Sequence, residues 1–180
     1  MTEPITWLAL GYNIPINPSK NRVYIWRKLK EYGAEYFKQG VALLPNNKTN
    51  LTRFAYLASK IREIGGEASI VEMKFIDYSD EMEIVERFKK QTASELDELK
   101  DDCFSLLKAL KLHTDQRISE YESDQLKKMV KRFSKAKSRD HFGCSESDDV
   151  EKGINLILDI VKCSAEEFAL QLRKNMNKAT

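Results

Sequence analysis

Short apolar runs alternate with amphipathic segments along the first 73 residues. The runs have the length of strands and are bounded by turn residues; they are Thr6–Tyr12, Gly40–Leu44 and Ala68–Met73. Between them, apolar residues recur at helical spacing. They are Val23, Ile25, Trp26 and Leu29 in the first segment, and Leu51, Phe54, Leu57, Ala58 and Ile61 in the second. The pattern predicts strand, helix, strand, helix and strand in that order, with both sets of apolar residues buried.

Capping residues place the ends of these two helices. Ser19 is the expected N-cap of the first helix, and Thr49 or Asn50 that of the second, because each side chain can accept a free backbone N–H. Gly33 and the pair Gly65-Gly66 follow the last helical residues, where a left-handed backbone conformation commonly ends a helix.

A further strand is expected between the first helix and the second apolar run. Residues Glu35–Phe37 and Val41–Leu44 are interpreted as the two arms of a short hairpin. The resulting order, β-α-β-β-α-β, is typical of the split unit of ferredoxin-like folds.

Beyond Asp77 the period of the apolar residues becomes helical throughout. Ser79–Leu112 is predicted as one long helix or two joined near Thr92–Ser94, followed by a polar break at His113–Arg117. A helix containing Leu126, Met129, Val130 and Phe133 comes next. A single final helix, capped by Ser147 or Asp148, is expected to bury Val150, Ile154, Ile157, Leu158, Val161, Phe168, Ala169 and Leu172.

The fold class expected from these patterns is α+β. A ferredoxin-like βαβ-type domain at residues 1–78 is expected to precede an antiparallel helical domain at residues 79–180, since the amphipathic helices must bury their apolar faces. We recognise no internal repeat in the sequence.

Composition and charge limit the classes of partner. The 180 residues carry 30 Lys and Arg against 28 Asp and Glu, a net charge of +2 that does not by itself establish nucleic-acid binding. Three widely spaced cysteines without a CxxC pair, and the absence of a recognisable signal sequence, favour the cytoplasm. No apolar run approaches the roughly 20 residues that span a bilayer, so no membrane partner is expected.

Basic residues nevertheless gather in two segments. Lys127–Arg139 holds seven basic residues and no acid, and Lys128, Arg132, Lys135 and Arg139 fall on one helical ridge. The first predicted helix offers Arg22, Arg27 and Lys28, flanked by Lys20 and Lys30, with Trp26 assigned to the core. Such residues can contact DNA phosphates. The alternative is a solvated surface whose charge is answered by acidic stretches such as Glu120–Asp124 or Asp148–Glu151.

No other group of residues indicates a catalytic or metal site. His113 and His141 are the only histidines, and Cys144 near His141 is a weak pair for a metal. Arg139-Asp140, beside Phe142, is interpreted as a local ion pair at a chain turn. We therefore expect no enzymatic activity, no metal and no cofactor.

The N-terminal segment resembles the N-terminal domain of the chromate-resistance regulator ChrB. The residues that carry the resemblance are Trp7-Leu8, Pro15, Pro18, Arg22-Val23, Ile25–Leu29, Gly33-Ala34, Gly40-Val41, Leu44-Pro45, Phe54, Leu57, Ile61 and Gly65–Ala68, with Arg139-Asp140 and Phe142 matching more loosely. The resemblance implies a DNA-binding regulator of chromate-resistance genes. ChrB proteins carry a further domain implicated in the chromate response, which is not expected in a chain ending at Thr180.

The strand and helix pattern is also similar to the middle domain of PaaX-type repressors, which are related to small CRISPR-adaptation nucleases. Those nucleases hold a metal with an Asp at the end of the first strand, where this chain has Tyr12-Asn13, so a nuclease is disfavoured. Three hypotheses follow: a ChrB-type DNA-binding regulator, a non-enzymatic protein-interaction module and, least favoured, a metal-dependent nuclease. A homodimer formed through a sheet edge is compatible with the first.

Overall fold

The structure is a computed structural model that describes residues 5–112 and 117–177. Its contacts gather into two compact units, one holding the described residues up to Phe88 and one holding those from Lys89 onward. We call them the N-terminal and C-terminal units. The expected division after residue 78 stays a prediction. Within the described residues no helix is both long enough and apolar enough to cross a membrane.

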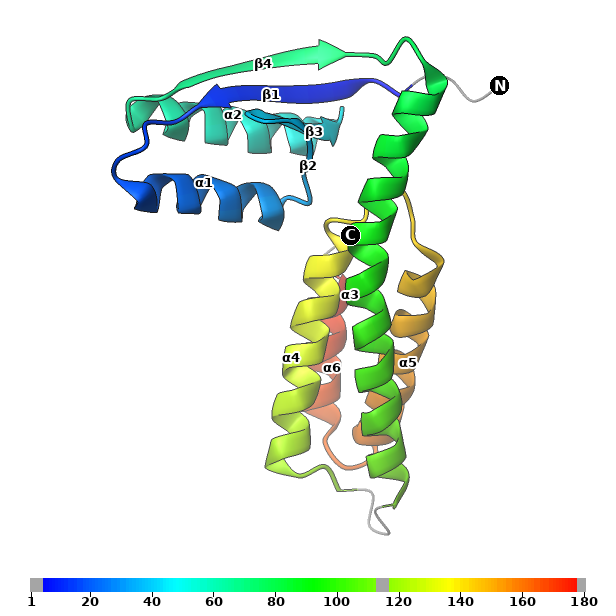
Figure 1. Ribbon diagram of the computed structural model, residues 1–180. Coiled ribbons are helices and arrows are strands. Elements are labelled where there is room, and N and C mark those ends of the chain that lie inside the picture. Colours follow the sequence, from blue (N-terminus) through cyan, green and yellow to red (C-terminus); the bar gives the residue numbers. More distant parts are fainter. Residues whose placement is uncertain (1–4, 113–116, 178–180) are drawn as a thin grey trace. The chain divides into compact units, whose positions relative to one another are not determined.

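The N-terminal unit is a four-stranded antiparallel sheet with α1 and α2 on the same side of it (Figure 1). Its elements are β1 (Trp7–Asn13), α1 (Ser19–Glu31), β2 (Glu35–Lys38), β3 (Val41–Pro45), α2 (Lys48–Glu63) and β4 (Glu67–Met73). The strand order is β2-β3-β1-β4, and every neighbouring pair is antiparallel. The mixed α+β class and the hairpin formed by β2 and β3 are confirmed.

Apolar residues on both faces of β1 hold this unit together. Leu8 and Leu10 are fully buried, as are Phe54 and Leu57 of α2. Trp7 is also fully buried, and its ring stacks at 5.7 Å on Phe88, in the first part of α3 (Tyr78–Leu112). That part of α3 therefore belongs to the core of the N-terminal unit.

Several predicted details of α1 and α2 are wrong. Pro18, rather than Ser19, occupies the N-cap position of α1, and Ser19 is the first helical residue. Asn47 caps α2 by accepting a hydrogen bond from the backbone N–H of Asn50. Leu51 is 46% exposed, because its position lies outside the narrow face that α2 turns to the sheet. The helix ends were predicted correctly: Gly33 and Gly65 have φ angles of 67° and 81°.

The C-terminal unit is a helical bundle. It consists of the remainder of α3 with α4 (Glu120–Lys137), α5 (Ser145–Lys162) and α6 (Glu166–Asn177), and successive helices run in opposite directions (Figure 1). One continuous apolar cluster fills the bundle, including Leu99, Phe133, Ile154, Val161 and Leu172.

Two expectations for the last part of the chain are corrected. The single final helix is two helices, because the chain leaves helical geometry at 163–165 and restarts at Glu166. The cap of α5 is Cys144 rather than Ser147 or Asp148. The expected polar break begins at His113, which lies outside the described residues, as does most of that segment.

Candidate nucleic-acid interface

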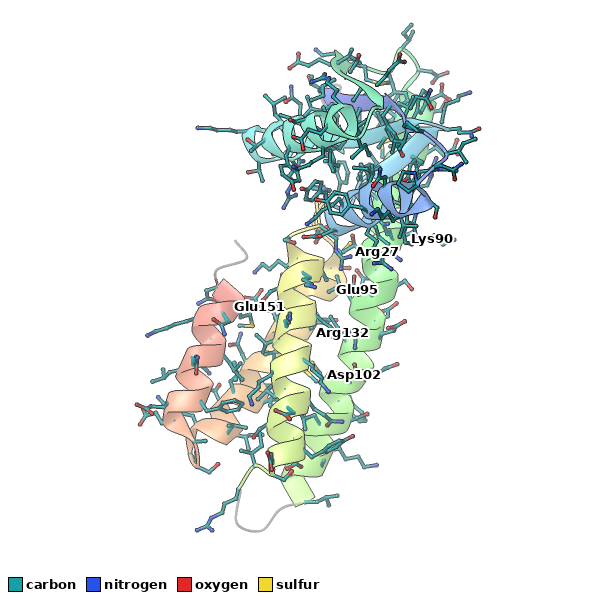
Figure 2. The ribbon with its side chains drawn as sticks, turned by 90° about the vertical axis from the view of Figure 1, so that its left-hand side faces the viewer. Arg27, Lys90, Glu95, Asp102, Arg132 and Glu151 are labelled. Carbon is teal, nitrogen blue, oxygen red and sulfur yellow. The ribbon has the colours of Figure 1, made fainter. Side chains whose placement is uncertain are left out.

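The cationic ridge predicted on α4 is partly neutralised within the C-terminal unit. Arg132 donates to Asp102 of α3 at 2.7 Å (Figure 2). It also donates to Glu98 of the same helix, α3, at 3.1 Å. Arg139 donates to Glu95, which also lies on α3. A phosphate would have to displace these carboxylates, so neither arginine is a ready anion site.

The lysines around that ridge divide into two groups. Lys127 pairs with Asp124 and Lys137 with Glu151, each at 2.9 Å, as the alternative interpretation of a solvated surface expected. Within the described residues, the side chains of Lys128 and Lys135 make no hydrogen bond or ion pair. Of the four predicted ridge residues, only these two lysines keep their charge available.

The basic patch predicted on α1 is exposed, but Trp26 is not in the core. The Trp26 side chain is 50% exposed, and Lys30 Nζ lies 5.5 Å from its ring centroid. The core assignment failed because the buried face of α1 consists of Ile25 and Leu29 alone. Arg22 and Arg27 are exposed on the same helix (Figure 2 labels Arg27).

Sequence analysis missed the contribution of α2 to this surface. Helices α1 and α2 together carry nine basic residues, Lys20, Arg22, Arg27, Lys28, Lys30, Lys48, Arg53, Lys60 and Arg62, and two acids, Glu31 and Glu63. From Glu67 to Phe88 the balance is reversed, with seven acids and two basic residues. The N-terminal unit therefore separates its charges. We call the outer face of α1 and α2 the basic helical layer.

The two helices of this layer end in the same pattern, which corrects the expectation that the sequence holds no repeat. Residues 24–33 read YIWRKLKEYG and residues 56–65 read YLASKIREIG, an offset of 32 positions. In each copy the lysine donates to the glutamate three residues later, at 2.9 Å in α1 and 2.7 Å in α2. Comparing the chain with itself at that offset would have found the repeat.

The repeated tyrosines meet between the helices. The hydroxyls of Tyr24 and Tyr56 lie 2.9 Å apart, and this hydrogen bond raises the pKa of Tyr24. Lys60 Nζ is 6.0 Å from the Tyr56 ring centroid, and the Arg53 guanidinium is 5.3 Å from that of Tyr32. The layer thus alternates aromatic rings with cations, a combination that suits contact with phosphates and nucleotide rings.

The residues considered for metal or thiol chemistry have structural surroundings. The Asp140 carboxylate accepts hydrogen bonds from the backbone N–H groups of Gly143 and Cys144, while Arg139 pairs with Glu95. Burial raises the pKa of the Cys103 thiol to about 12 and that of Cys144 to about 11. Among the described residues no three His, Cys, Asp or Glu side chains gather as metal ligands, and His113 lies outside that part of the chain.

Comparison with known proteins decides the family. The family model described as "Protein ChrB, N-terminal" matches residues 22–175, which include most of α1, all of α2 and nearly all of the helical bundle. The chain belongs to this family. The resemblance predicted from the sequence is therefore confirmed, and the family match extends across both units. No curated protein and no solved structure matches the chain significantly.

Proposed function

We propose that this member of the ChrB N-terminal family is a DNA-binding transcriptional regulator associated with chromate resistance. The observation that carries the proposal is the excess of positive charge in the basic helical layer, whose two helices hold nine basic residues and only two acids. Membership of the family, whose name is that of a chromate-resistance regulator, supports the biological context.

The electrostatics of the layer favour a polyanion over a small acidic ligand. Lys28 and Lys60 are each paired with the glutamate three residues later, while Lys20, Arg22, Arg27, Lys30, Lys48 and Arg62 are exposed cations. Each cation that replaces a counterion on a DNA phosphate contributes to affinity and makes it depend on salt. Six such residues on one layer suffice for several phosphate contacts.

The arrangement of the sheet unit fits this role. Its element order and strand order are those of a split β-α-β unit, and we propose that it is ferredoxin-like. In that arrangement both helices cover one face of the sheet, so their cations form one surface instead of two.

The test measures binding to random duplex DNA by fluorescence anisotropy at a series of salt concentrations. We expect log K to fall linearly with log salt. The triple variant Lys20→Gln, Arg27→Gln, Lys30→Gln should weaken binding and reduce the slope by about three, one for each lost phosphate contact. The matched control is Lys108→Gln, Lys111→Gln, Lys152→Gln, which removes three exposed cations from the C-terminal unit.

Equal loss in the two triple variants would refute the layer as the DNA contact. A separate double variant, Lys128→Gln, Lys135→Gln, tests the remaining cations of the α4 ridge. We expect a smaller effect there, since Arg132 and Arg139 are occupied by carboxylates.

A non-enzymatic protein-interaction module is the second candidate. Exposed aromatic and aliphatic groups on α1 favour it, since Trp26 is 50% and Val23 44% exposed. Such groups are enriched at protein interfaces. No binding to duplex DNA at low salt would leave this candidate in place of the first.

The proposal places the protein in the cytoplasm, acting without catalysis and as a homodimer. Strand β4 pairs with β1 on one side and is an edge of the sheet on the other, so a second chain can extend the sheet there. Sedimentation equilibrium would test the dimer: a mass of one chain at micromolar concentration contradicts it.

A further inference from the structure

A cavity of about 820 Å³ opens on the N-terminal unit between the first turns of α1 and the β2–β3 hairpin. Its lining includes two cations, Arg22 and Lys38, and three aromatic side chains, Tyr12, Tyr36 and Trp26. None of the lining residues is an Asp or Glu. The cavity therefore combines positive charge with flat apolar surface, and its lining holds no carboxylate that would pair with a cation.

The two cations of this cavity are available to pair with a ligand. No carboxylate among the described residues forms an ion pair with Arg22 or Lys38. Tyr12 and Tyr36 are joined through their side-chain hydroxyls, and burial together with this bond raises the pKa of Tyr12. One of the two hydroxyls donates this bond to the other, so one phenol O–H is left as a donor beside the two cations.

We propose that this cavity binds a small organic anion that carries a planar ring, such as an aryl carboxylate or a nucleoside monophosphate. The anionic group would contact Arg22 and Lys38, since a guanidinium matches a carboxylate or phosphate with two parallel hydrogen bonds. The ring would lie against Trp26, half of which is exposed. The volume lies within the range of cavities that hold ligands of this size.

This site goes beyond the proposed DNA contact. Phosphates along a duplex are bound by exposed cations and need no cavity, whereas Tyr12, Tyr36 and Lys38 belong to strands outside the basic helical layer. A ligand here can therefore be detected with no DNA present. Failure of DNA binding and failure of ligand binding are separate results.

The test is a titration of the full chain with a candidate ligand, monitored by proton–nitrogen NMR. The chain has two tryptophans, Trp26 in the cavity and Trp7 fully buried, so it gives two indole N–H signals. Trp26→Phe assigns them. With 2-naphthoate or adenosine 5′-monophosphate as probe, we expect the Trp26 signal to move along a saturable curve while the Trp7 signal stays in place.

A neutral analogue of the probe and protein variants that each lack one cation test the role of charge. 2-Naphthamide has the ring of 2-naphthoate without its charge and should bind at least about tenfold more weakly. Arg22→Met and Lys38→Met should each lower the affinity for 2-naphthoate about tenfold, while Lys74→Met, which removes an exposed cation elsewhere in the same unit, should not.

The two probes also distinguish the source of the anion. Tighter binding of adenosine 5′-monophosphate assigns the cavity to nucleotides, and tighter binding of 2-naphthoate assigns it to aryl carboxylates. Equal affinity for the amide and the carboxylate, unchanged affinity in both methionine variants, or no saturable shift of Trp26 with either probe would overturn the proposal.

Discussion

The carboxylate of Glu81 is a sensitive point in the N-terminal unit. Glu81 is 3% exposed, and one of its oxygens accepts hydrogen bonds from the indole N–H of Trp7 at 3.0 Å and the backbone N–H of Ile5 at 3.1 Å. Glu81→Ala leaves both donors without this acceptor. A donor left unsatisfied in the interior costs about 1–3 kcal/mol, so we expect a loss of about 3 kcal/mol in the free energy of unfolding. Glu81→Gln keeps an acceptor oxygen and should lose about 1 kcal/mol.

Urea unfolding followed by tryptophan fluorescence measures this effect, because both tryptophans lie in the N-terminal unit. The matched control is Glu83→Ala, an exposed acid two residues along the same helix, for which we expect a change within about 0.5 kcal/mol. A loss in Glu81→Ala no larger than in Glu83→Ala would refute the assignment of the first turns of α3 to the core of this unit.

Three further predictions concern other parts of the chain. Gly66→Ala should destabilise the N-terminal unit by about 1–3 kcal/mol, since the added Cβ would lie 2.6 Å from a backbone oxygen. Gly11→Ala, whose Cβ would lie 4.0 Å from its nearest neighbour, should have little effect in the same urea assay. Arg132→Met should lower the free energy of unfolding of the C-terminal unit by at most about 1 kcal/mol, a difference that high salt removes. In a thiol-reagent assay at pH 8, exposed Cys163 should react with the native protein, whereas Cys103, with a pKa of about 12, should react only after unfolding.

The order of strands and helices in the N-terminal unit could be read from the sequence because local signals agree there. Apolar runs have strand length, and Gly33 and Gly65 end the two helices where a positive φ is required. The hairpin, by contrast, was inferred because a ferredoxin-like order requires one more strand between α1 and α2. Which apolar residues are buried was harder to predict. Val23 and Trp26 share helical spacing with Leu29, yet only a narrow face of α1 meets the sheet.

The fate of the basic residues could not be predicted from local patterns. Arg132 and Arg139 find their carboxylates on α3, at least 30 positions earlier in the chain, and no spacing rule connects them. The division between α5 and α6 was missed for another reason: residues 163–165 are Cys, Ser and Ala, none of which is a strong helix breaker. The family, by contrast, was recognised from residues most of which the family model also covers; Trp7-Leu8, Pro15 and Pro18 precede the matched range.

The repeated helix ends give the N-terminal unit the form of a fused dimer. One half is β1, α1 and β2, the other is β3, α2 and β4, and each holds one copy of the tyrosine, lysine and glutamate pattern. A chain with a single half would complete the four-stranded sheet only by meeting a second copy, at a concentration set by its dissociation constant. The short turn between β2 and β3 replaces that encounter with a covalent link. Tyr24 and Tyr56 therefore meet at any dilution, and each half is free to diverge, as the tryptophan in one copy and the alanine in the other already show.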